Sequence, residues 1–189
     1  MFGIIFGLIG FICYIIYDIN AIIWKKKVFF SFFFLGSIIV ILSSLYSYTT
    51  TYGEAGFSER VFLMFVFSLC FFLLLIYTLF FALPFQKTYR DHAEIPSVCD
   101  SGVYALCRHP GFLWFLFLYL FLGLTLRASY FIYFGLFLSA CNFFYICLQD
   151  IYVFPRQFKD YQTYKNQTPF LVPSLSSIRK CLRTITRRV

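Results

Sequence analysis

The residues best suited to chemistry stand together in the segment GVYALCRHPGFLW, residues 102–114, where an Arg-His-Pro triplet directly precedes an apolar run. Pro110 suits the first position of a helix, because the amide hydrogen that proline lacks would have no partner there. His109 would then cap this helix, and Arg108 would set a permanent charge beside the unpaired amides of the helix start. The triplet predicts an anion receptor. The alternative is that Arg108 only anchors a membrane-spanning helix at the headgroups.

Apolar residues dominate the elements that must position this triplet. Of 189 residues, 61% are hydrophobic and only 13% are charged, whereas a water-soluble domain is about half apolar. A helix needs about 20 apolar residues to cross the hydrocarbon layer, and runs of that order recur here without the alternation of a barrel strand. We therefore expect an all-α integral membrane protein with about five transmembrane helices, at residues 2–24, 28–48, 61–83, 111–126 and 129–148. The fourth run is short for a span, and it forms a hairpin with the fifth that turns at Arg127.

The basic residues predict the orientation of the chain in the membrane. All Lys and Arg residues except Arg60 and Arg127 fall on one side of the expected spans. Because cytoplasmic flanks carry the excess of positive charge, we expect a multi-pass protein with its N-terminus outside and its C-terminus cytoplasmic. The first run has no charged residue before it and no small-residue cleavage site after it, so we expect it to stay as a helix. The chain is expected to form a single membrane domain in three parts: N-terminal helices at 1–83, a cytoplasmic connection, hairpin and catalytic segment at 84–173, and a basic tail at 174–189.

The segment after the fifth run interleaves polar and aromatic residues. Pro155 is expected to bend or interrupt a helix that continues from the run. Phe158, Tyr161 and Tyr164 stand at steps of three, which gives one aromatic face to a helical turn.

The tail repeats Ile178, Leu182, Ile185 and Val189 at helical spacing, with arginines and a lysine between them. This pattern predicts an amphipathic helix that lies on anionic lipid. Nucleic acid could use the same charges, but membrane tethering makes lipid the simpler partner, and we expect no nucleic-acid binding.

The seven cysteines form no Cys-x-x-Cys pair, so a disulfide framework is not expected. Cys99, Cys107 and His109 are the candidate zinc ligands, but their spacing fits no common zinc site. We expect no metal.

Two segments carry a resemblance to a known family. GVYALCRHPGF at the mouth of the predicted hairpin and QDIYVFPRQFKDYQTYKNQTPFLVP just after it together resemble the isoprenylcysteine carboxyl methyltransferase family, over roughly the C-terminal half of the chain. That family has Gly-x-Tyr, a short spacer, Arg-His-Pro-x-Tyr-x-Gly, a helical hairpin, Glu-Glu, and a Phe and two Tyr before a proline-bounded apolar stretch. The matching positions are Gly102, Tyr104, Arg108, His109, Pro110, Phe158, Tyr161, Tyr164, Pro169 and Pro173.

The chain departs from this pattern at three places. Phe112 replaces the usual tyrosine, Trp114 replaces the usual glycine, and Gln149-Asp150 replaces the acidic pair. In relatives, the acidic pair and the Arg-His-Pro segment help to hold S-adenosylmethionine in a cytoplasmic pocket beside the membrane. Asp150 keeps one carboxylate on a shorter side chain.

The resemblance implies S-adenosylmethionine-dependent methyl transfer to a lipophilic acceptor, a lipid or a prenylated-cysteine carboxylate. Arg108 and the helix start suit the carboxylate of this cofactor, and Asp150 suits its ammonium. Aromatic rings suit its adenine or sulfonium. His109 would donate a hydrogen bond or orient the acceptor. The expected site residues are Arg108 and His109 for catalysis, and Tyr104, Arg108, His109, Asp150, Tyr161 and Tyr164 for the cofactor.

Other activities remain open. A carboxylate acceptor requires no general base, whereas an amine acceptor does, and His109 or Asp150 would be the local candidates. The alternatives are a phospholipid amine N-methyltransferase, an NADPH-dependent sterol-reductase-like enzyme, and a membrane scaffold that has lost catalysis.

Overall fold

The structure, a computed structural model, describes residues 2–50, 58–82 and 96–186. Its regular elements in these ranges are all helical, which confirms the expected all-α class for this part of the chain. They are α1 (Phe2–Ile19), the π-helical turn η1 (Asn20–Trp24), the 3₁₀ turn η2 (Lys27–Ser31), α2 (Phe32–Thr49), α3 (Glu59–Ile76), the π-helical turn η3 (Tyr77–Phe81), α5 (Val103–Leu106), α6 (Pro110–Leu126), α7 (Ser129–Leu148), the π-helical turn η4 (Gln149–Val153), α8 (Phe154–Gln157), α9 (Tyr161–Gln167) and α10 (Leu175–Thr186).

In the part of the chain that the structure describes, four helical stretches are long and apolar enough to cross a membrane: Phe2–Trp24, Lys27–Thr49, Glu59–Phe81 and Ser129–Gln157. The fourth expected span, residues 111–126, forms α6, which has only 17 residues. At 1.5 Å per residue it is about 25 Å long, less than the roughly 30 Å of hydrocarbon. The described chain is therefore a multi-pass membrane protein by its helices, with α6 as the short member that the sequence already indicated.

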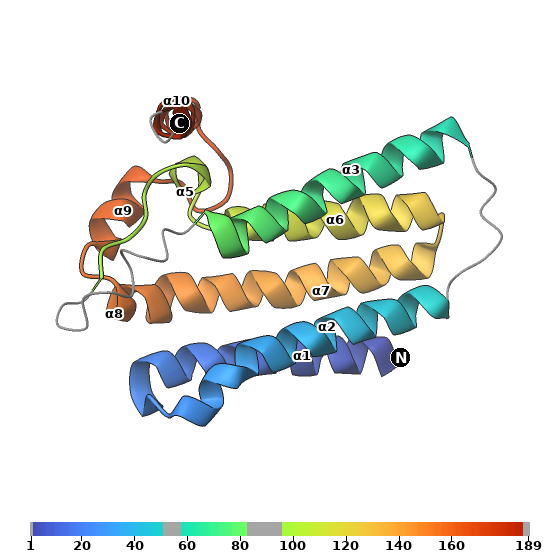
Figure 1. The fold of residues 1–189 in the computed structure, drawn as a ribbon, viewed down its shortest axis with the longest axis horizontal. Helices are drawn as coiled ribbons and strands as arrows, with labels where there is room; N and C mark the ends of the chain where they lie inside the picture. Colours follow the sequence, from blue (N-terminus) through green and yellow to red (C-terminus); the bar gives the residue numbers. More distant parts are fainter. Residues whose placement is uncertain (1, 51–57, 83–95, 187–189) are drawn as a thin grey trace.

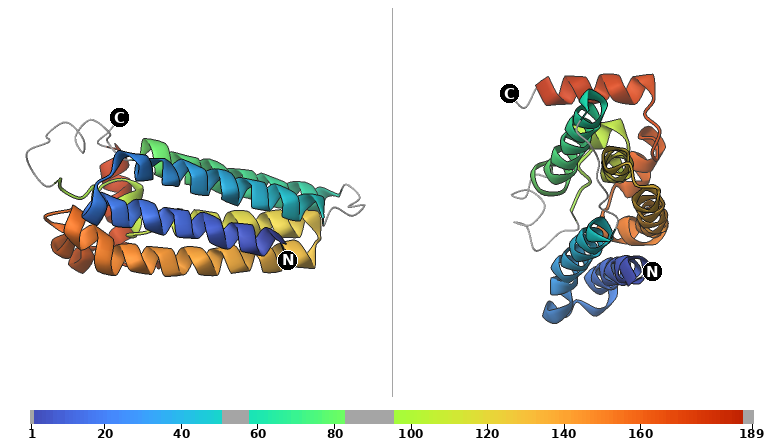
Figure 2. Two further views of the ribbon diagram at one scale, coloured as in Figure 1. Left: turned by 90° about the horizontal axis from the view of Figure 1, so that it is seen from below. Right: turned by 90° about the vertical axis from the view of Figure 1, so that its right-hand side faces the viewer.

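The long helices run side by side in one bundle (Figures 1 and 2). α1 packs on α2, α3 packs on α6, and α7 joins the two pairs because it contacts both α6 and α1. The short elements α5, α8, α9 and α10 gather at one end of the bundle, while α1 begins at the other end (Figure 1). This arrangement brings the residues around the Arg-His-Pro triplet to a single end.

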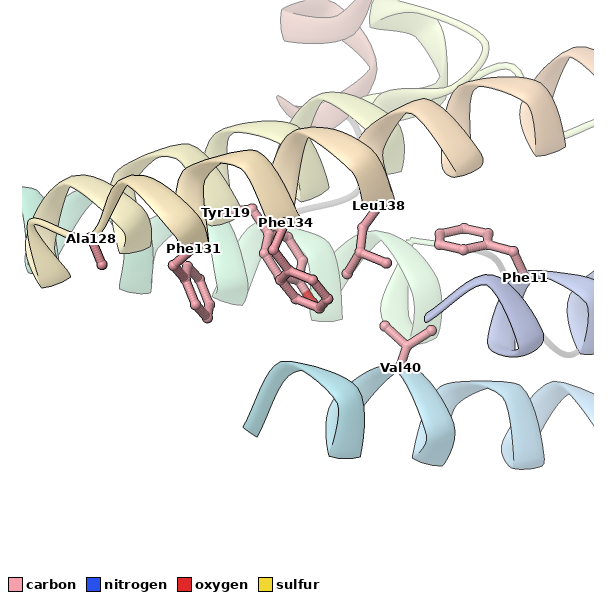
Figure 3. Close-up of a cluster of buried hydrophobic side chains, with 7 residues drawn as sticks. All are labelled: Phe11, Val40, Tyr119, Ala128, Phe131, Phe134 and Leu138. Carbon is pink, nitrogen blue, oxygen red and sulfur yellow. The ribbon is translucent and has the colours of Figure 1, made fainter. Parts of the chain in front are cut away.

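The core lies where α7 meets its neighbours (Figure 3). Phe131, Phe134 and Leu138 of α7 are fully buried, against Tyr119 of α6 and Phe11 of α1. Large apolar side chains also cover the outside of the bundle, such as Phe34, which is 64% exposed. An apolar surface of this extent is the surface that lipid requires.

The ends of α6 follow from local chemistry. Pro110 occupies the first turn of α6, as its missing amide predicts. Arg127 ends the helix in the left-handed conformation, with φ of 51°, and α7 starts two residues later, so the predicted hairpin at Arg127 is confirmed.

Pro155 was expected to bend or interrupt the helix that continues from the fifth run. The helix is not interrupted at Pro155, since it continues through η4 and α8 to Gln157, but regular α-helical hydrogen bonding changes to a π turn directly before this residue. One expectation for this segment is wrong. Phe158 is not part of the aromatic helical face, because it adopts an extended conformation between α8 and α9. Tyr161 and Tyr164 do share a buried face of α9.

The contact between α1 and α2 depends on two glycines. A Cβ added to Gly36 would lie 2.7 Å from the carbonyl oxygen of Gly10, a backbone atom that cannot move aside cheaply. A Cβ at Gly111 would meet only side-chain atoms at 3.8 Å or more.

We therefore expect Gly36→Ala to lower the stability of the protein by about 1–3 kcal/mol, the usual cost of overpacking. Gly111→Ala, the control, should be neutral or stabilising, since alanine is the better helix former. Thermal unfolding in one detergent measures both. Equal melting temperatures for the two variants would contradict the close approach of α1 and α2.

Candidate functional site

Asp150 is the centre of a buried charged cluster at this end of the bundle. It is 4% exposed. Arg108 Nη1 lies 3.0 Å from its Oδ1, and Lys165 Nζ lies 2.8 Å from its Oδ2. Tyr161 donates a hydrogen bond of 2.6 Å to Oδ1. Two cations therefore surround one carboxylate, which leaves the cluster with an excess positive charge.

The local backbone explains how Asp150 reaches this position. It lies in the π-helical turn η4, where the amide of Phe154 donates to the carbonyl of Gln149, five residues earlier. A π turn rotates the side chains that follow it relative to an ordinary helix, and such turns often occur at functional sites.

Arg108 comes from the connection between α5 and α6. Its backbone amide donates to the carbonyl of Pro169 at 2.9 Å, which joins the two segments that carry the resemblance. Its guanidinium lies over the ring of Phe170, 5.3 Å from the ring centre, a distance at which a cation and an aromatic face attract each other.

His109 is held between aromatic rings. Its ring stacks on Phe154 at 5.8 Å and meets Phe170 edge to face at 5.1 Å. Burial lowers the pKa of His109 below its ordinary value of 6.5, although the nearby Asp150 carboxylate opposes this shift. The imidazole is therefore neutral at pH 7.

Tyr104 and Tyr164 adjoin the cluster through α5. The Tyr164 hydroxyl donates to the carbonyl of Tyr104 at 2.6 Å, and the Tyr104 hydroxyl donates to the carbonyl of Thr78 at 3.0 Å. Burial raises the pKa of both tyrosines, so both remain protonated donors. Tyr161 and Tyr164 place their rings 5.9 Å apart on α9.

All six sequence-predicted site residues thus lie at one end of the bundle. Arg108, His109, Asp150 and Tyr161 form the cluster itself, and Tyr104 and Tyr164 border it. Arg108 and Asp150 contact each other directly, whereas the sequence interpretation assigned them to opposite charges of one cofactor.

Sequence reasoning missed two residues of this site. Lys165 makes the shortest ion pair with Asp150, and it stands four residues after Tyr161, a spacing that places both on the same face of α9. Thr78 of η3 holds Tyr104 through its carbonyl and accepts a 3.0 Å hydrogen bond from Trp114 Nε1 through its hydroxyl. The indole at position 114, a departure from the family pattern, therefore links α3 to α6.

Gln149 points away from the cluster, toward α1. Its Nε2 donates to Asp18 Oδ2 and to the Tyr145 hydroxyl, each at 2.9 Å. Asp18 is 4% exposed. The position where the family carries the first acid of its pair is here an amide facing a second buried carboxylate.

Three buried polar atoms at the cluster have no hydrogen-bond partner among the described residues: Arg108 Nε, His109 Nε2 and Thr168 Oγ1. His109 Nε2 lies 3.5 Å from Asp150 Oδ1, too far for a well-formed hydrogen bond. Buried polar groups are nearly always paired, so these atoms are available to a bound molecule, either ordered water or a ligand. Donors on an arginine and a neutral imidazole fit an anion or a carboxylate.

Within residues 2–50, 58–82 and 96–186, no group of three or more His, Cys, Asp or Glu side chains could hold a metal ion. Cys107 is fully buried, and burial raises its pKa to about 12, so it stays a thiol.

No protein-family model, no curated protein and no solved structure matches this chain. The geometry of the cluster and the motif resemblance therefore carry the functional argument.

We expect Asp150→Asn to destabilise the protein by about 3–5 kcal/mol, because Arg108 would be left as a buried cation without a carboxylate. Lys165, whose side chain is 32% exposed, would lose its partner as well but can be solvated. The control is Asp100→Asn, which breaks the exposed pair with Lys180 and should cost about 0–1 kcal/mol. Thermal or denaturant unfolding in detergent compares them. An Asp150→Asn protein as stable as the Asp100→Asn protein would mean that the cluster is not a structural centre.

We also expect the contribution of His109 to stability to fall as the pH drops below about 6.5. The unfolded chain takes up a proton on His109 at its ordinary pKa, whereas the folded protein does so only at lower pH, so acid favours unfolding through this group. His109→Phe keeps a ring between Phe154 and Phe170 and should remove this contribution, so the parent should lose more stability than the variant between pH 6.5 and 5. His92→Gln is the control. An unchanged slope between pH 6.5 and 5 in His109→Phe would rule out a depressed pKa.

Proposed function

We propose that this protein is a membrane methyltransferase that uses S-adenosylmethionine and acts on a lipophilic acceptor, either a lipid or a prenylated-cysteine carboxylate. The observation that carries the proposal is the convergence of Arg108, Asp150 and Tyr161. They come from the two segments that carry the resemblance, residues 102–112 and 149–173, and they meet in one buried cluster. Arg108 and Tyr161 match the family motif, and Asp150 stands where the motif has its acidic pair.

The charges of the cluster suit the cofactor. S-adenosylmethionine has a carboxylate, an ammonium and a sulfonium, and when bound it would supply the methyl group. The excess cation at Arg108 and Lys165 suits the carboxylate, and the unpaired Nε of Arg108 is a free donor for it. Asp150 holds Arg108 in place through their ion pair, and its carboxylate oxygens are taken by Arg108, Lys165 and Tyr161. Phe154, Phe170 and Tyr161 offer aromatic faces to the adenine ring or the sulfonium.

The protein residues would act by alignment and by exclusion of water. A carboxylate acceptor gives its own electron pair to the methyl carbon, so no proton moves and no general base is needed. His109 Nε2 can then orient the acceptor oxygen. For an amine acceptor, as in a phospholipid amine N-methyltransferase, the neutral His109 imidazole is the group able to accept the proton.

We propose that the N-terminus faces outside, so that the cluster lies at the cytoplasmic side, where S-adenosylmethionine is available. The arrangement of charges supports this orientation. Arg127 reaches Ser58 at 3.0 Å, which places the two expected outer arginines at the end of the bundle opposite the cluster.

A second candidate is a scaffold in which the cluster only braces the bundle. Asp150 favours this function, because its carboxylate already has three partners from the chain itself. Titration with S-adenosylmethionine, its demethylated product and NADPH separates the candidates. The methyltransferase binds the first two, a reductase binds NADPH, and a scaffold binds none.

We expect Arg108→Ala to weaken S-adenosylmethionine binding by about 2–5 kcal/mol, the range for loss of one member of a buried charge pair. Arg108→Lys should recover part of the loss, because lysine restores the charge but not the fork of donors. Asp150→Glu should retain or improve binding, since glutamate is the acid of the family pattern.

The matched control is Arg156→Ala, which removes an arginine that lies over Tyr152 outside the cluster. Calorimetric titration of each variant, with folding checked by thermal melting, gives the comparison. If folded Arg108→Ala binds as tightly as the parent, the cluster is not the cofactor site.

A further inference from the structure

The C-terminal helix α10 has three distinct sides. One side packs on the protein through the buried Ser177 and Cys181, and Thr184 Oγ1 accepts a 2.9 Å hydrogen bond from the amide of Gly102. Arg179 and Arg183 form a second, exposed side. The third side is apolar and exposed: Leu175 at 76%, Ile178 at 38%, Leu182 at 61% and Ile185 at 43%. With 3.6 residues per turn, these sets fall in separate sectors around the helix.

The direction of α10 differs from that of the bundle. In Figure 1 α10 is seen end-on, while the long helices run across the view. In the right-hand view of Figure 2 α10 runs across the view, while the long helices point roughly toward the viewer. A helix perpendicular to spanning helices lies parallel to the membrane plane. It sits at the end of the bundle where the candidate site is found (Figure 1).

We propose that α10 is seated on the membrane surface, with its apolar side in the headgroup boundary and Arg179 and Arg183 on anionic phospholipid headgroups. The positive charge of the two arginines favours anionic headgroups over neutral ones. Because the bundle spans the membrane, the headgroup layer always lies close to α10. Burial of an apolar helix side together with electrostatic attraction is the usual basis of interfacial helix binding. This inference stands whether or not the protein transfers methyl groups.

The lipid-seated helix also holds the segment that carries Arg108. Besides the hydrogen bond from Gly102, Lys180 Nζ of α10 pairs with Asp100 at 2.7 Å, so α10 grips the residues just before α5. On its other side, α5 is held by the Tyr164 hydroxyl at the carbonyl of Tyr104. Lipid that restrains α10 therefore restrains α5 and the start of the Arg-His-Pro triplet.

Hydrogen–deuterium exchange of the full chain in nanodiscs tests the proposal. The discs hold one protein copy in phosphatidylcholine, alone or with phosphatidylglycerol. We expect the anionic lipid to slow exchange in α10 and in α5. Arg183→Gln should reduce the effect of the anionic lipid by about five-fold, the value of about 1 kcal/mol for one basic residue near an anionic surface. Arg60→Gln, the same change at the start of α3, should leave the effect intact.

Two further variants separate the steps. Leu182→Ser should speed exchange of α10 in both lipids, because it removes an apolar contact without changing charge. Thr184→Val should leave α10 responsive to anionic lipid but reduce the response of α5, and Thr184→Val together with Asp100→Asn, which removes the Lys180 pair as well, should abolish it. Thr163→Val, an exposed control on α9, should change neither response.

Several results would overturn the proposal. Equal exchange of α10 in the two lipids would show that anionic headgroups do not seat it. Protection that appears only in discs with two copies would show that a second chain covers the apolar side instead. An α5 response that survives Thr184→Val together with Asp100→Asn would show that α10 does not hold α5 through Gly102 and Asp100.

Discussion

The burial of the Asp150 carboxylate is the constraint on which this end of the molecule depends. Taking an ion out of water costs several kcal/mol, and the cost is met only when partners with good geometry surround it. Arg108 from the loop before α6 and Tyr161 and Lys165 from α9 supply those partners. The ion pair of Lys165 and the hydrogen bond of Tyr161 with this carboxylate hold the short α9 at this end of the bundle. The π turn that follows α7 contributes too, because it directs the Asp150 carboxylate toward these partners.

Gln149 shows how the same region is joined to the N-terminal helices. Asp18 of α1 is buried opposite it, and the Gln149 amide donates to that carboxylate. An acid at position 149 would set two buried carboxylates against each other with no cation paired to either among the described residues. The amide is therefore the residue type that Asp18 requires, and the difference from the pattern that this segment resembles has a local reason in α1. It also places a second carboxylate, from a helix with no family motif, next to the candidate site.

The sequence predicted the helices and most of the cluster, but it did not predict the contacts between helices. Pro110, Arg127 and the periodic tail were readable because each has a local signature: a missing amide, a tight turn, and alternation of apolar and basic residues. In lipid, however, every face of a spanning helix is apolar, so hydrophobicity does not distinguish the face that meets another helix. This is why the roles of Thr78 and Trp114 went unforeseen. Lys165 was missed for a different reason, since its spacing from Tyr161 was visible but the resemblance assigned it no role. For Pro155, the missing amide predicted a disturbance of the helix but not its form, which is a π turn directly before this residue and a helix end two residues after it.

Some features of the cluster favour a purely structural role, and others favour a ligand site. Its charges and its unpaired polar atoms distinguish the two roles. A brace needs as many cations as anions and pairs every polar atom, because unpaired buried groups cost about 1–3 kcal/mol each. Here the carboxylate is fully paired, but Arg108 Nε, His109 Nε2 and Thr168 Oγ1 have no protein partner among the described residues. Lys165 is 32% exposed and can be solvated, so its charge needs no second anion inside the cluster. The buried Arg108 is different, because its Nε needs an acceptor, and ordered water or a bound anionic group would supply one. A structural role explains Asp150, whereas the unpaired donors are the part of the cluster that a carboxylate or another anion beside Arg108 would use.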